Sequence, residues 1–292
     1  MKIAILGPTA SGKSALAAAL AVRFGGTVVN GDPFQAYGGL AIGTGQPTLE
    51  DQGGVTHLGY GCLPLSLRVN PHSFGERVQG WLGGCSRPVL VTGSGLYLRG
   101  IWGQLSEFPA VPEALQERVR RWTDRLGGPT LHRFLGAVDP LRAAQLHPND
   151  RSRIQRALAL HLATGGPPSA LLDGVKGGVP EGWKALLVLP SRESLRLRVA
   201  HRVRTMVEAG WPQEVAALVA SGQEQDLRAL HPLGYLAWLE GGDPEARIVQ
   251  ETQAYAKRQS TFFRNQWPEI PTWDPDTEDL EAAAHRIQAP GA

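Results

Sequence analysis

The sequence predicts an α/β protein whose parallel sheet is flanked by helices and interrupted by an all-helical insertion. Three apolar runs in the first hundred residues, at 3–6, 27–30 and 89–92, alternate with glycine-rich turns and helical stretches. This alternation is typical of a parallel sheet with helices on both faces. A fourth apolar run, at 184–189, indicates that the sheet resumes after a long stretch without strand candidates.

The stretch between these runs reads as helices only. Proline and glycine residues end the alternating pattern, helical patterns follow to about His161, and a Gly-Gly-Pro-Pro sequence at 165–168 stops the block. We therefore expect a core domain of residues 1–105 and 170–292, with a helical insertion domain at 106–169. Further core helices are predicted over residues 192–209, 213–220, 243–265 and 280–287.

Residues 7–14 follow the pattern G-x-x-x-x-G-K-S, between an apolar strand candidate and an alanine-rich helix former. This context predicts a phosphate-binding loop and a P-loop NTPase-like fold. The loop's backbone N–H groups and the helix N-terminus attract anions, Lys13 reaches the terminal phosphates, and the Ser14 hydroxyl suits a Mg²⁺ cofactor. ATP is the usual occupant, but any diphosphate fits the same loop. The predicted diphosphate-binding residues are Gly7, Pro8, Thr9, Ala10, Ser11, Gly12, Lys13 and Ser14.

Polar residues follow the second and third apolar runs. Asp32 comes directly after the second run, and Ser94 lies between glycines after the third. Because the carboxyl ends of parallel strands line the ligand crevice, we expect Asp32 to face the ligand that Lys13 holds. A turn or capping role is the alternative for both residues. No acidic residue follows the third run where an NTPase usually holds its metal, which weighs against ATP hydrolysis.

The net charge is only +2, but arginines cluster in two blocks, at 118–156 and 192–204. Guanidinium groups bind phosphates well, so the clusters favour a polyanionic partner over simple solvated helix faces. Within the second block, Arg198 and Arg202 could clamp a diphosphate or an RNA backbone, or pair with Glu193 and Glu208. Residues 256–264 interleave cations with Phe262 and Phe263, which suits single-stranded RNA unless both rings pack in the core.

Composition excludes several classes of protein. Two cysteines cannot build a disulfide framework or a zinc finger. No run approaches the ~20 apolar residues of a membrane span, and the first apolar run is too short for a signal peptide. We therefore expect a cytoplasmic protein that does not insert into membranes, and we expect it to be a monomer.

Taken in order, the motifs resemble those of the tRNA dimethylallyltransferases, also called tRNA isopentenyltransferases. Residues 7–14 match the phosphate loop of that family, and Asp-Pro-Phe-Gln-Ala-Tyr at 32–37 is similar to its D-S-x-Q-x-Y. Gly-Ser-Gly-Leu-Tyr at 93–97 matches most of G-G-T-G-L-Y, and residues 147–158 resemble H-P-N-D-x-x-R-x-x-R-A-L. Gly234-Tyr235 and the Tyr-Ala-Lys-Arg-Gln sequence at 255–259 complete a series that spans roughly residues 2–267.

The resemblance implies transfer of a dimethylallyl group from its diphosphate to the exocyclic amine (N6) of the adenine 3′-adjacent to the tRNA anticodon. By resemblance, Asp32, Lys13, Arg202 and Thr9 are catalytic: Asp32 accepts the proton of the amine, and the cations stabilise the leaving diphosphate. The insertion would grip the anticodon stem. The implied tRNA-binding residues are Asp32, Pro33, Phe34, Gln35, Ser94, Arg153, Arg156, His231, Gly234, Tyr235, Lys257, Arg258, Gln259 and Arg264.

The sequence departs from the pattern of this family at several positions. Pro33 replaces a serine, Gly31 an alanine, Thr92 a glycine, Ala159 a glutamate and Gln253 an arginine. None of these changes removes a catalytic residue. The C-terminal zinc finger of eukaryotic members cannot form with two cysteines, which indicates a bacterial-type enzyme. Two alternatives are an ATP-dependent small-molecule or nucleotide kinase and a non-catalytic RNA-binding protein; the latter has no need of a carboxylate at Asp32.

Overall fold

The computed structural model describes residues 1–106, 109–172 and 177–288. It divides the chain into two compact units: a core unit of Met1–Gly103 with Gly177–Ala292, and an insertion unit of Gln104–Lys176. The short helix α11 (Ser169–Leu172) belongs to the insertion unit, although the boundary expected at residue 170 divides it between the two domains.

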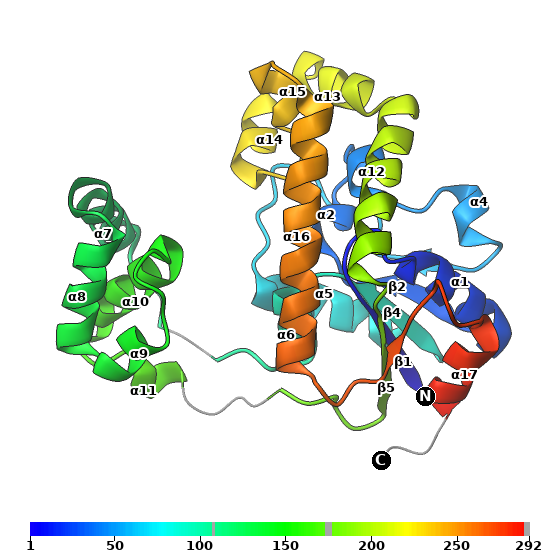
Figure 1. Cartoon of the computed structure of the whole chain (residues 1–292), viewed down its shortest axis with the longest axis horizontal. Coiled ribbons are helices and arrows are strands. Elements are labelled where there is room, and N and C mark those ends of the chain that lie inside the picture. The colour runs from blue at the N-terminus through cyan, green and yellow to red at the C-terminus, as the bar shows by residue number, and fades with distance from the viewer. Residues whose placement is uncertain (107–108, 173–176, 289–292) are drawn as a thin grey trace. The chain divides into compact units, whose positions relative to one another are not determined.

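The core unit is built on one parallel six-stranded sheet in the order β3-β2-β4-β1-β5-β6 (Figure 1). The four predicted strands are present, and the predicted α/β fold is confirmed. Two further strands, β3 and β6, have two residues each and are too short to show a pattern in the sequence. The strands are β1 (Lys2–Leu6), β2 (Thr27–Asn30), β3 (His57–Leu58), β4 (Pro88–Thr92), β5 (Trp183–Val188) and β6 (Thr272–Trp273).

Both faces of the sheet are buried, which explains why its strands read as continuous apolar runs. Along β1, Ile3 and Ile5 pack with α1 (Lys13–Phe24) and α17 (Leu280–Gln288), whereas Ala4 and Leu6 join the larger cluster on the other face. That larger cluster includes residues of α5 (Pro71–Gly83), α6 (Gly95–Ile101), α12 (Arg192–Glu208), α13 (Trp211–Ala220), α14 (Glu224–Leu230), α15 (Ala237–Glu240) and α16 (Pro244–Gln266). Three single-turn helices, α2 (Pro33–Ala36), α3 (Ala41–Thr44) and α4 (Leu49–Gln52), follow β2.

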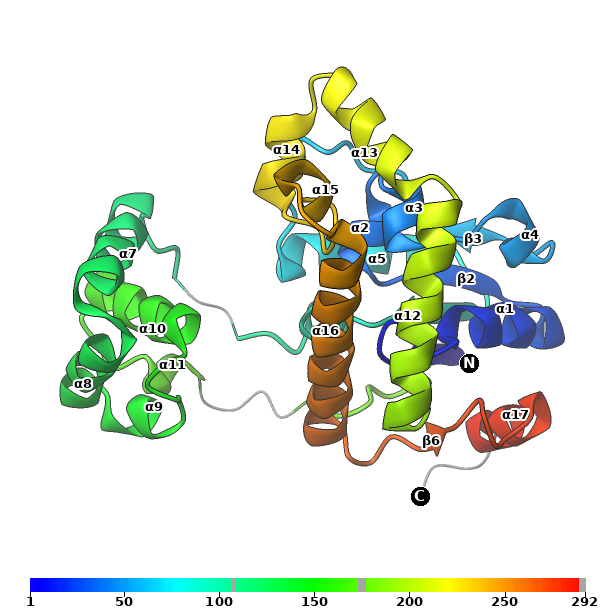
Figure 2. The ribbon, with the colours of Figure 1, turned by 45° about the horizontal axis from the view of Figure 1, so that its top comes forward.

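The helices α12 and α16 lie side by side in the core unit (Figures 1 and 2). Side chains of both helices reach the carboxyl ends of the central strands. The Asp243 side chain caps the start of α16 by accepting a hydrogen bond from the Ala246 amide. The Ser191 side chain caps the start of α12 by accepting from the Ser194 amide. Such caps satisfy amide groups that a helix leaves open at its start. Side chains of both helices reach the phosphate-binding loop: Gln259 of α16 bonds the Thr9 amide, and Arg198 of α12 lies beside Gly12.

The insertion unit has a core of its own. Val119, Leu131, Leu135 and Ile154 are fully buried, and they come from three different helices. The arginines of the first block lie on the outside of this unit, exposed except for the half-buried Arg142. The helices are α7 (Glu113–Leu126), α8 (Gly128–Val138), α9 (Pro140–Ala144), α10 (Arg151–Thr164) and α11.

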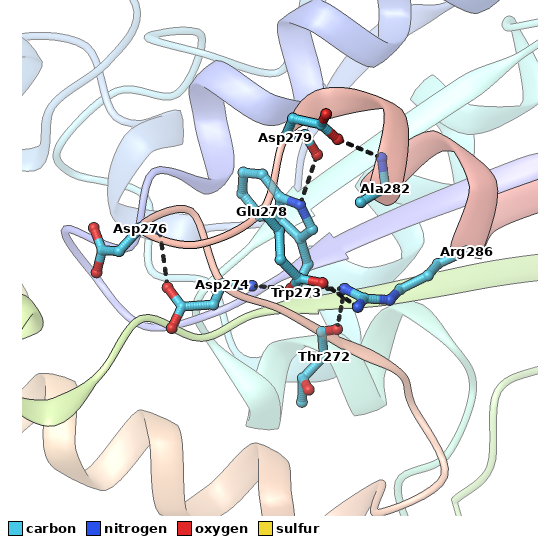
Figure 3. Close-up of polar contacts among 8 residues, drawn as sticks. All are labelled: Thr272, Trp273, Asp274, Asp276, Glu278, Asp279, Ala282 and Arg286. Carbon is cyan, nitrogen blue, oxygen red and sulfur yellow. Dashed lines mark hydrogen bonds and ion pairs between the residues drawn. The ribbon is translucent and has the colours of Figure 1, made fainter.

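A polar network holds the segment between β6 and α17 (Figure 3). The Trp273 indole donates to the Asp279 carbonyl at 3.0 Å, and Arg286 pairs with Glu278 and donates to the Thr272 carbonyl at 2.7 Å. This network fixes the loop that carries Asp276, whose backbone amide donates to Asp274.

Across the ranges that the structure describes, none of the helices is both long and apolar enough to cross a membrane.

The two phenylalanines that follow the cations of α16 pack in the core. Phe263 is 1% exposed, and both Phe262 and Phe263 have ring centroids 6.0 Å from the ring of the buried Trp267. The alternative in which these rings stack on RNA bases is therefore wrong for Phe263, because no surface of its ring is available.

We predict that Phe263→Ala lowers the free energy of unfolding by about 3–5 kcal/mol, because it opens a cavity among aromatic side chains. Leu197→Ala is the matched control: Leu197 is 68% exposed on α12 of the same unit, and its change should stay within about 0.5 kcal/mol. Denaturant unfolding measures both values, and equal small losses would contradict the packing described here.

Candidate active site

The phosphate-binding loop connects β1 to α1 and has an unusual backbone. Ala10 has a φ of 63° and Gly12 a φ of 90°, left-handed values that favour glycine and occur at functional sites. No side chain caps the start of α1, so its first amide groups remain open to an anion. The Ser11 hydroxyl is buried and has no hydrogen-bond partner among the described residues. The loop is thus shaped to hold a ligand with oxygen acceptors.

Lys13 lies where a bound phosphate group would meet it. Its ammonium donates to the Pro8 carbonyl at 3.3 Å, across the loop. Burial and the positive charge of Arg202 together lower the pKa of Lys13 to about 8, although the carboxylate of Asp32 partly opposes both effects. A diphosphate bound here would favour the charged form of Lys13.

Two arginines of α12 flank the loop in different ways. Arg202 points inward, where its guanidinium lies 3.4 Å from the Thr44 carbonyl and burial lowers its pKa. Arg198 pairs with Asp276 at 2.5 Å and donates to the Ser194 hydroxyl at 3.1 Å. Within the described residues, neither arginine pairs with the glutamates of its own helix, so that alternative is wrong, and only Arg202 lines the pocket described below.

Asp32 sits at the carboxyl end of β2, and both its backbone and its side chain are held. Asn30, fully buried, accepts from the Asp32 amide at 2.8 Å and donates to the Asp32 carbonyl at 2.9 Å. The carboxylate caps α2 by accepting from the Phe34 amide at 3.0 Å, and the nearby Ser94 side chain lowers its pKa. Burial raises the pKa of Asp32, although Lys13 opposes the shift. The result is a carboxylate that takes up a proton more readily than an exposed one.

A pocket of about 290 Å³ brings the predicted catalytic residues together. Thr9, Lys13, Asp32 and Arg202 all line it. The pocket therefore places a lysine of the phosphate-binding loop and a carboxylate at the end of β2 around one cavity. Of the predicted tRNA-binding residues, Phe34, Gln35, His231, Gly234 and Gln259 also line it, together with Gly43, Thr44, Pro232, Leu233, Leu236, Ala237, Arg247, Glu251 and Tyr255.

Gln259 links the phosphate-binding loop to the neighbouring strand end. Its Oε1 accepts from the Thr9 amide at 2.8 Å, and its Nε2 donates to the Gly93 carbonyl at 2.8 Å. The side chain is only 6% exposed and both polar groups of its amide are engaged. Gln259 therefore positions the loop, and its contact with tRNA stays a prediction.

Two more predicted tRNA contacts are also buried. The Tyr235 ring is 0% exposed and its hydroxyl donates to Glu214 at 2.6 Å. Glu214 in turn accepts from the Ile42 amide at 2.8 Å, so this pair anchors α3. Pro33 is buried as the first residue of α2. The side chains of Tyr235 and Pro33 thus serve the fold and offer no surface to RNA.

Three residues of α16 line the pocket but are not among the site residues predicted from the sequence. Arg247, Glu251 and Tyr255 line the pocket with Gln259, and the four are spaced four residues apart on one helix face. Arg247 donates to Glu251 at 2.8 Å. This spacing was readable in the sequence, but nothing in it indicated which face of the helix meets the pocket.

A second cavity, of about 520 Å³, lies between α12 and α16, and we call it the basic groove. Its charged lining residues are Arg192, Arg196, Lys257 and Arg264, and no acidic side chain of the described chain lines it. Gln253, the departure from a common arginine, also lines the groove and contacts the Arg196 carbonyl at 3.4 Å. Two predicted RNA contacts, Lys257 and Arg264, therefore lie in the same cavity as Arg192 and Arg196.

The remaining predicted RNA contacts are placed separately. Arg258 is exposed, with its guanidinium 5.7 Å from the centre of the Tyr255 ring. On the insertion unit, Arg153 and Arg156 are exposed and line a depression of about 260 Å³ together with Arg142. Ala159, another departure from the family pattern, is buried in the core of this unit.

Ser14 lies in the first turn of α1 with an exposed side chain. Within the described residues, no group of three or more His, Cys, Asp or Glu side chains could hold a metal ion. Mg²⁺ commonly uses one or two protein oxygens and completes its shell with phosphate and water oxygens. The hydroxyl of Ser14 beside the phosphate-binding loop fits that mode of binding.

Comparison with known proteins adds an independent result. The family model "IPP transferase" matches residues 35–266 and the model "Isopentenyl transferase" matches residues 1–58. The chain is 37% identical over 305 residues to a tRNA dimethylallyltransferase of Methylorubrum extorquens, covering 99% of this chain and 95% of the relative. It is 39% identical over 291 residues to that of Methylobacterium radiotolerans, covering 96% and 94%.

Solved structures agree with the sequence matches. A tRNA isopentenylpyrophosphate transferase of Bacillus halodurans superposes with a TM-score of 0.67 at 27% identity, covering 98% of this chain and 96% of the other. A eukaryotic dimethylallyltransferase acting on tRNA gives a TM-score of 0.75 at 25% identity, covering 97% and 77%. By sequence over nearly its whole length and by fold, the chain belongs to the tRNA dimethylallyltransferase family, as a member of bacterial type.

Proposed function

We propose that this protein transfers the dimethylallyl group of dimethylallyl diphosphate to N6 of the adenine 3′-adjacent to the anticodon of tRNA. The observation that carries the proposal is the single pocket in which Lys13 and Asp32 meet. The bond between C1 of the dimethylallyl group and the diphosphate oxygen breaks, and a bond between C1 and N6 forms. Diphosphate leaves, and N6 gives up one proton.

On the leaving-group side, the phosphate-binding loop and two cations receive the developing charge. Lys13 and Arg202 are half-buried beside the loop, where an anionic ligand compensates for the hydration that both charges lose. Thr9, whose amide is fixed by Gln259, adds a hydroxyl to the same pocket. Ser14 and diphosphate oxygens would hold Mg²⁺, which supplies further charge neutralisation when bound.

On the acceptor side, Asp32 takes the proton. The exocyclic amine of adenine is a weak nucleophile because its lone pair is delocalised into the ring, so a positioned proton acceptor helps. Asp32 is held through its backbone by Asn30, and its pKa is raised by burial. The adenine must leave its stack to enter the pocket, where Phe34, Gln35 and His231 line the walls.

The tRNA itself is a polyanion, and the surface supplies matching charge. The basic groove lies on the core unit, and exposed arginines including Arg153 and Arg156 lie on the insertion unit. We propose that the groove holds the RNA backbone near the flipped adenine and that the insertion contacts the anticodon stem. This assignment retains Lys257 and Arg264 as RNA contacts and adds Arg192 and Arg196.

The decisive experiment incubates the purified protein with dimethylallyl diphosphate, Mg²⁺ and unmodified tRNA. Mass spectrometry of the digested nucleosides should show N6-dimethylallyladenosine, which should be lost with Lys13→Met. A parallel incubation with ATP and small hydroxyl acceptors covers the kinase alternative. ATP consumption there, without prenylated adenosine in the first reaction, would overturn the proposal.

We predict that Asp32→Asn lowers kcat by about 10²–10⁴-fold, because it removes the proton acceptor. Asparagine keeps an oxygen that can cap α2, so the loop should stay folded and the Kd for tRNA should change little. Asp32→Ala should lose comparable activity. Steady-state kinetics and tRNA binding measure both effects, and near-normal turnover of Asp32→Asn would exclude this role.

Binding of dimethylallyl diphosphate should weaken as pH rises above 8. The pKa of Lys13 is lowered to about 8, so the ligand-free lysine is charged below this pH and becomes neutral above it. Binding then requires proton uptake, and Kd should increase by up to about tenfold per pH unit. Calorimetric titrations between pH 7 and 9.5 test this, with Lys13→Met as a control that should bind weakly without this trend. A flat wild-type profile would contradict it.

The double variant Arg192→Gln/Arg196→Gln should raise the Kd for tRNA about tenfold at moderate salt. The slope of log Kd against the logarithm of the salt concentration should decrease by about two, because two phosphate contacts are lost. The matched control is Arg77→Gln/Arg204→Gln, which removes two exposed arginines outside the groove. Equal weakening by both pairs would indicate a general charge effect, and no weakening by the first pair would remove the groove from the RNA path.

A further inference from the structure

The hydroxyl of Thr92 joins the carboxyl ends of two strands. Thr92 is the last residue of β4 and is fully buried. Its Oγ1 donates to the Gly31 carbonyl, just beyond β2, at 2.7 Å. The same oxygen accepts from the Ser94 amide at 3.0 Å. One hydroxyl therefore ties the segment after β2 to the segment after β4.

The bridge adjoins Asp32, which lines the pocket. Asp32 follows Gly31 on one strand end, and Ser94, whose side chain lowers the pKa of Asp32, follows Thr92 on the other. Asn30 holds the Asp32 backbone from the other side of the turn. The relative position of the Asp32 carboxylate and the Ser94 hydroxyl thus depends on how the two strand ends are joined.

Gly31 makes room for Thr92. A Cβ atom at position 31 would lie 2.9 Å from the Thr92 Cβ, 3.0 Å from the Leu90 Cδ1 and 3.2 Å from the Val91 carbonyl oxygen. The first of these contacts is too short to persist without a shift. The two departures from the family pattern at these positions, glycine for alanine and threonine for glycine, are therefore complementary: one residue is smaller and its neighbour is larger.

We propose that Thr92 is a positioning residue for the transfer reaction, and that its hydroxyl bridge, which Gly31 permits, holds the strand end that carries Asp32 against the strand end that carries Ser94. The inference rests on the proposed function, because it assigns Thr92 an effect on the proton acceptor of that reaction. Thr92 does not line the pocket. It acts through the backbone of Gly31 and Ser94.

The first test compares Thr92→Val, which keeps the shape and removes the hydroxyl, with Thr92→Ser, which keeps the hydroxyl. The valine variant should lower kcat by about tenfold, from the loss of one buried bridging group, and leave KM for dimethylallyl diphosphate unchanged. The serine variant should stay within about threefold of wild type. Wild-type kcat in the valine variant, or equal losses in both variants, would overturn the proposal.

The pH profile separates positioning from a loss of packing. The Ser94 side chain lowers the pKa of Asp32, so a displaced strand end should move the acidic limb of kcat to higher pH in Thr92→Val. A profile that falls uniformly without this displacement would indicate a structural role alone.

A double-mutant cycle tests the pairing with Gly31. Gly31→Ala alone should lower both Tm and kcat, whereas adding Gly31→Ala to Thr92→Gly should produce little further loss. Additive losses would show that the two positions are independent. Tm is measured without substrate, so this arm stands even if wild-type protein fails to prenylate tRNA, which would instead refute the proposed function.

Discussion

The burial of unlike charges in one pocket is the constraint on which the rest of this site depends. Lys13 and Arg202 lose hydration there, and burial lowers the pKa of both cations, while the carboxylate of Asp32 opposes the shifts. Burying a charged group without a full set of hydrogen-bond and charge partners is unfavourable. Such groups are expected where a bound ligand supplies the missing partners. Two cations against one carboxylate leave an excess of positive charge, which matches a diphosphate.

Keeping these groups in place requires a scaffold of buried polar residues. Gln259 connects the phosphate-binding loop to the end of β4, Asn30 holds Asp32, and Glu214 with Tyr235 anchors α3. A resemblance to RNA-contacting motifs identified two of these residues, Gln259 and Tyr235, as tRNA contacts. Their burial shows that a residue can belong to a functional motif because it holds the site together.

The same principle explains the sequence departures beside the site. Gly31 and Thr92 occupy neighbouring strand ends, where the missing side chain at one position leaves space for the other. Gln253 and Ala159 lie away from the pocket, in the basic groove and in the core of the insertion. Departures from a family pattern thus become interpretable once the neighbours of each residue are known.

The sequence by itself determined the α/β fold, the phosphate-binding loop, the catalytic candidates and the helical insertion. These follow from local signals: apolar runs, a glycine-containing loop between strand and helix, and a carboxylate at a strand end. Lys13 and Asp32 could be paired in advance because the carboxyl ends of parallel strands share one edge of the sheet.

Only the tertiary structure decided which polar residues face the pocket and which support it. Thr9 and Gln259 stand 250 positions apart in sequence and share a hydrogen bond, and the Thr92 hydroxyl reaches across 61 positions to Gly31. Two faces of α16 line two different cavities: Arg247, Glu251 and Tyr255 line the pocket, and Lys257 and Arg264 line the basic groove. The orientation of α16 relative to the neighbouring helices determines this assignment. Helical periodicity defines the faces of a helix, but the packing of distant segments decides what each face meets.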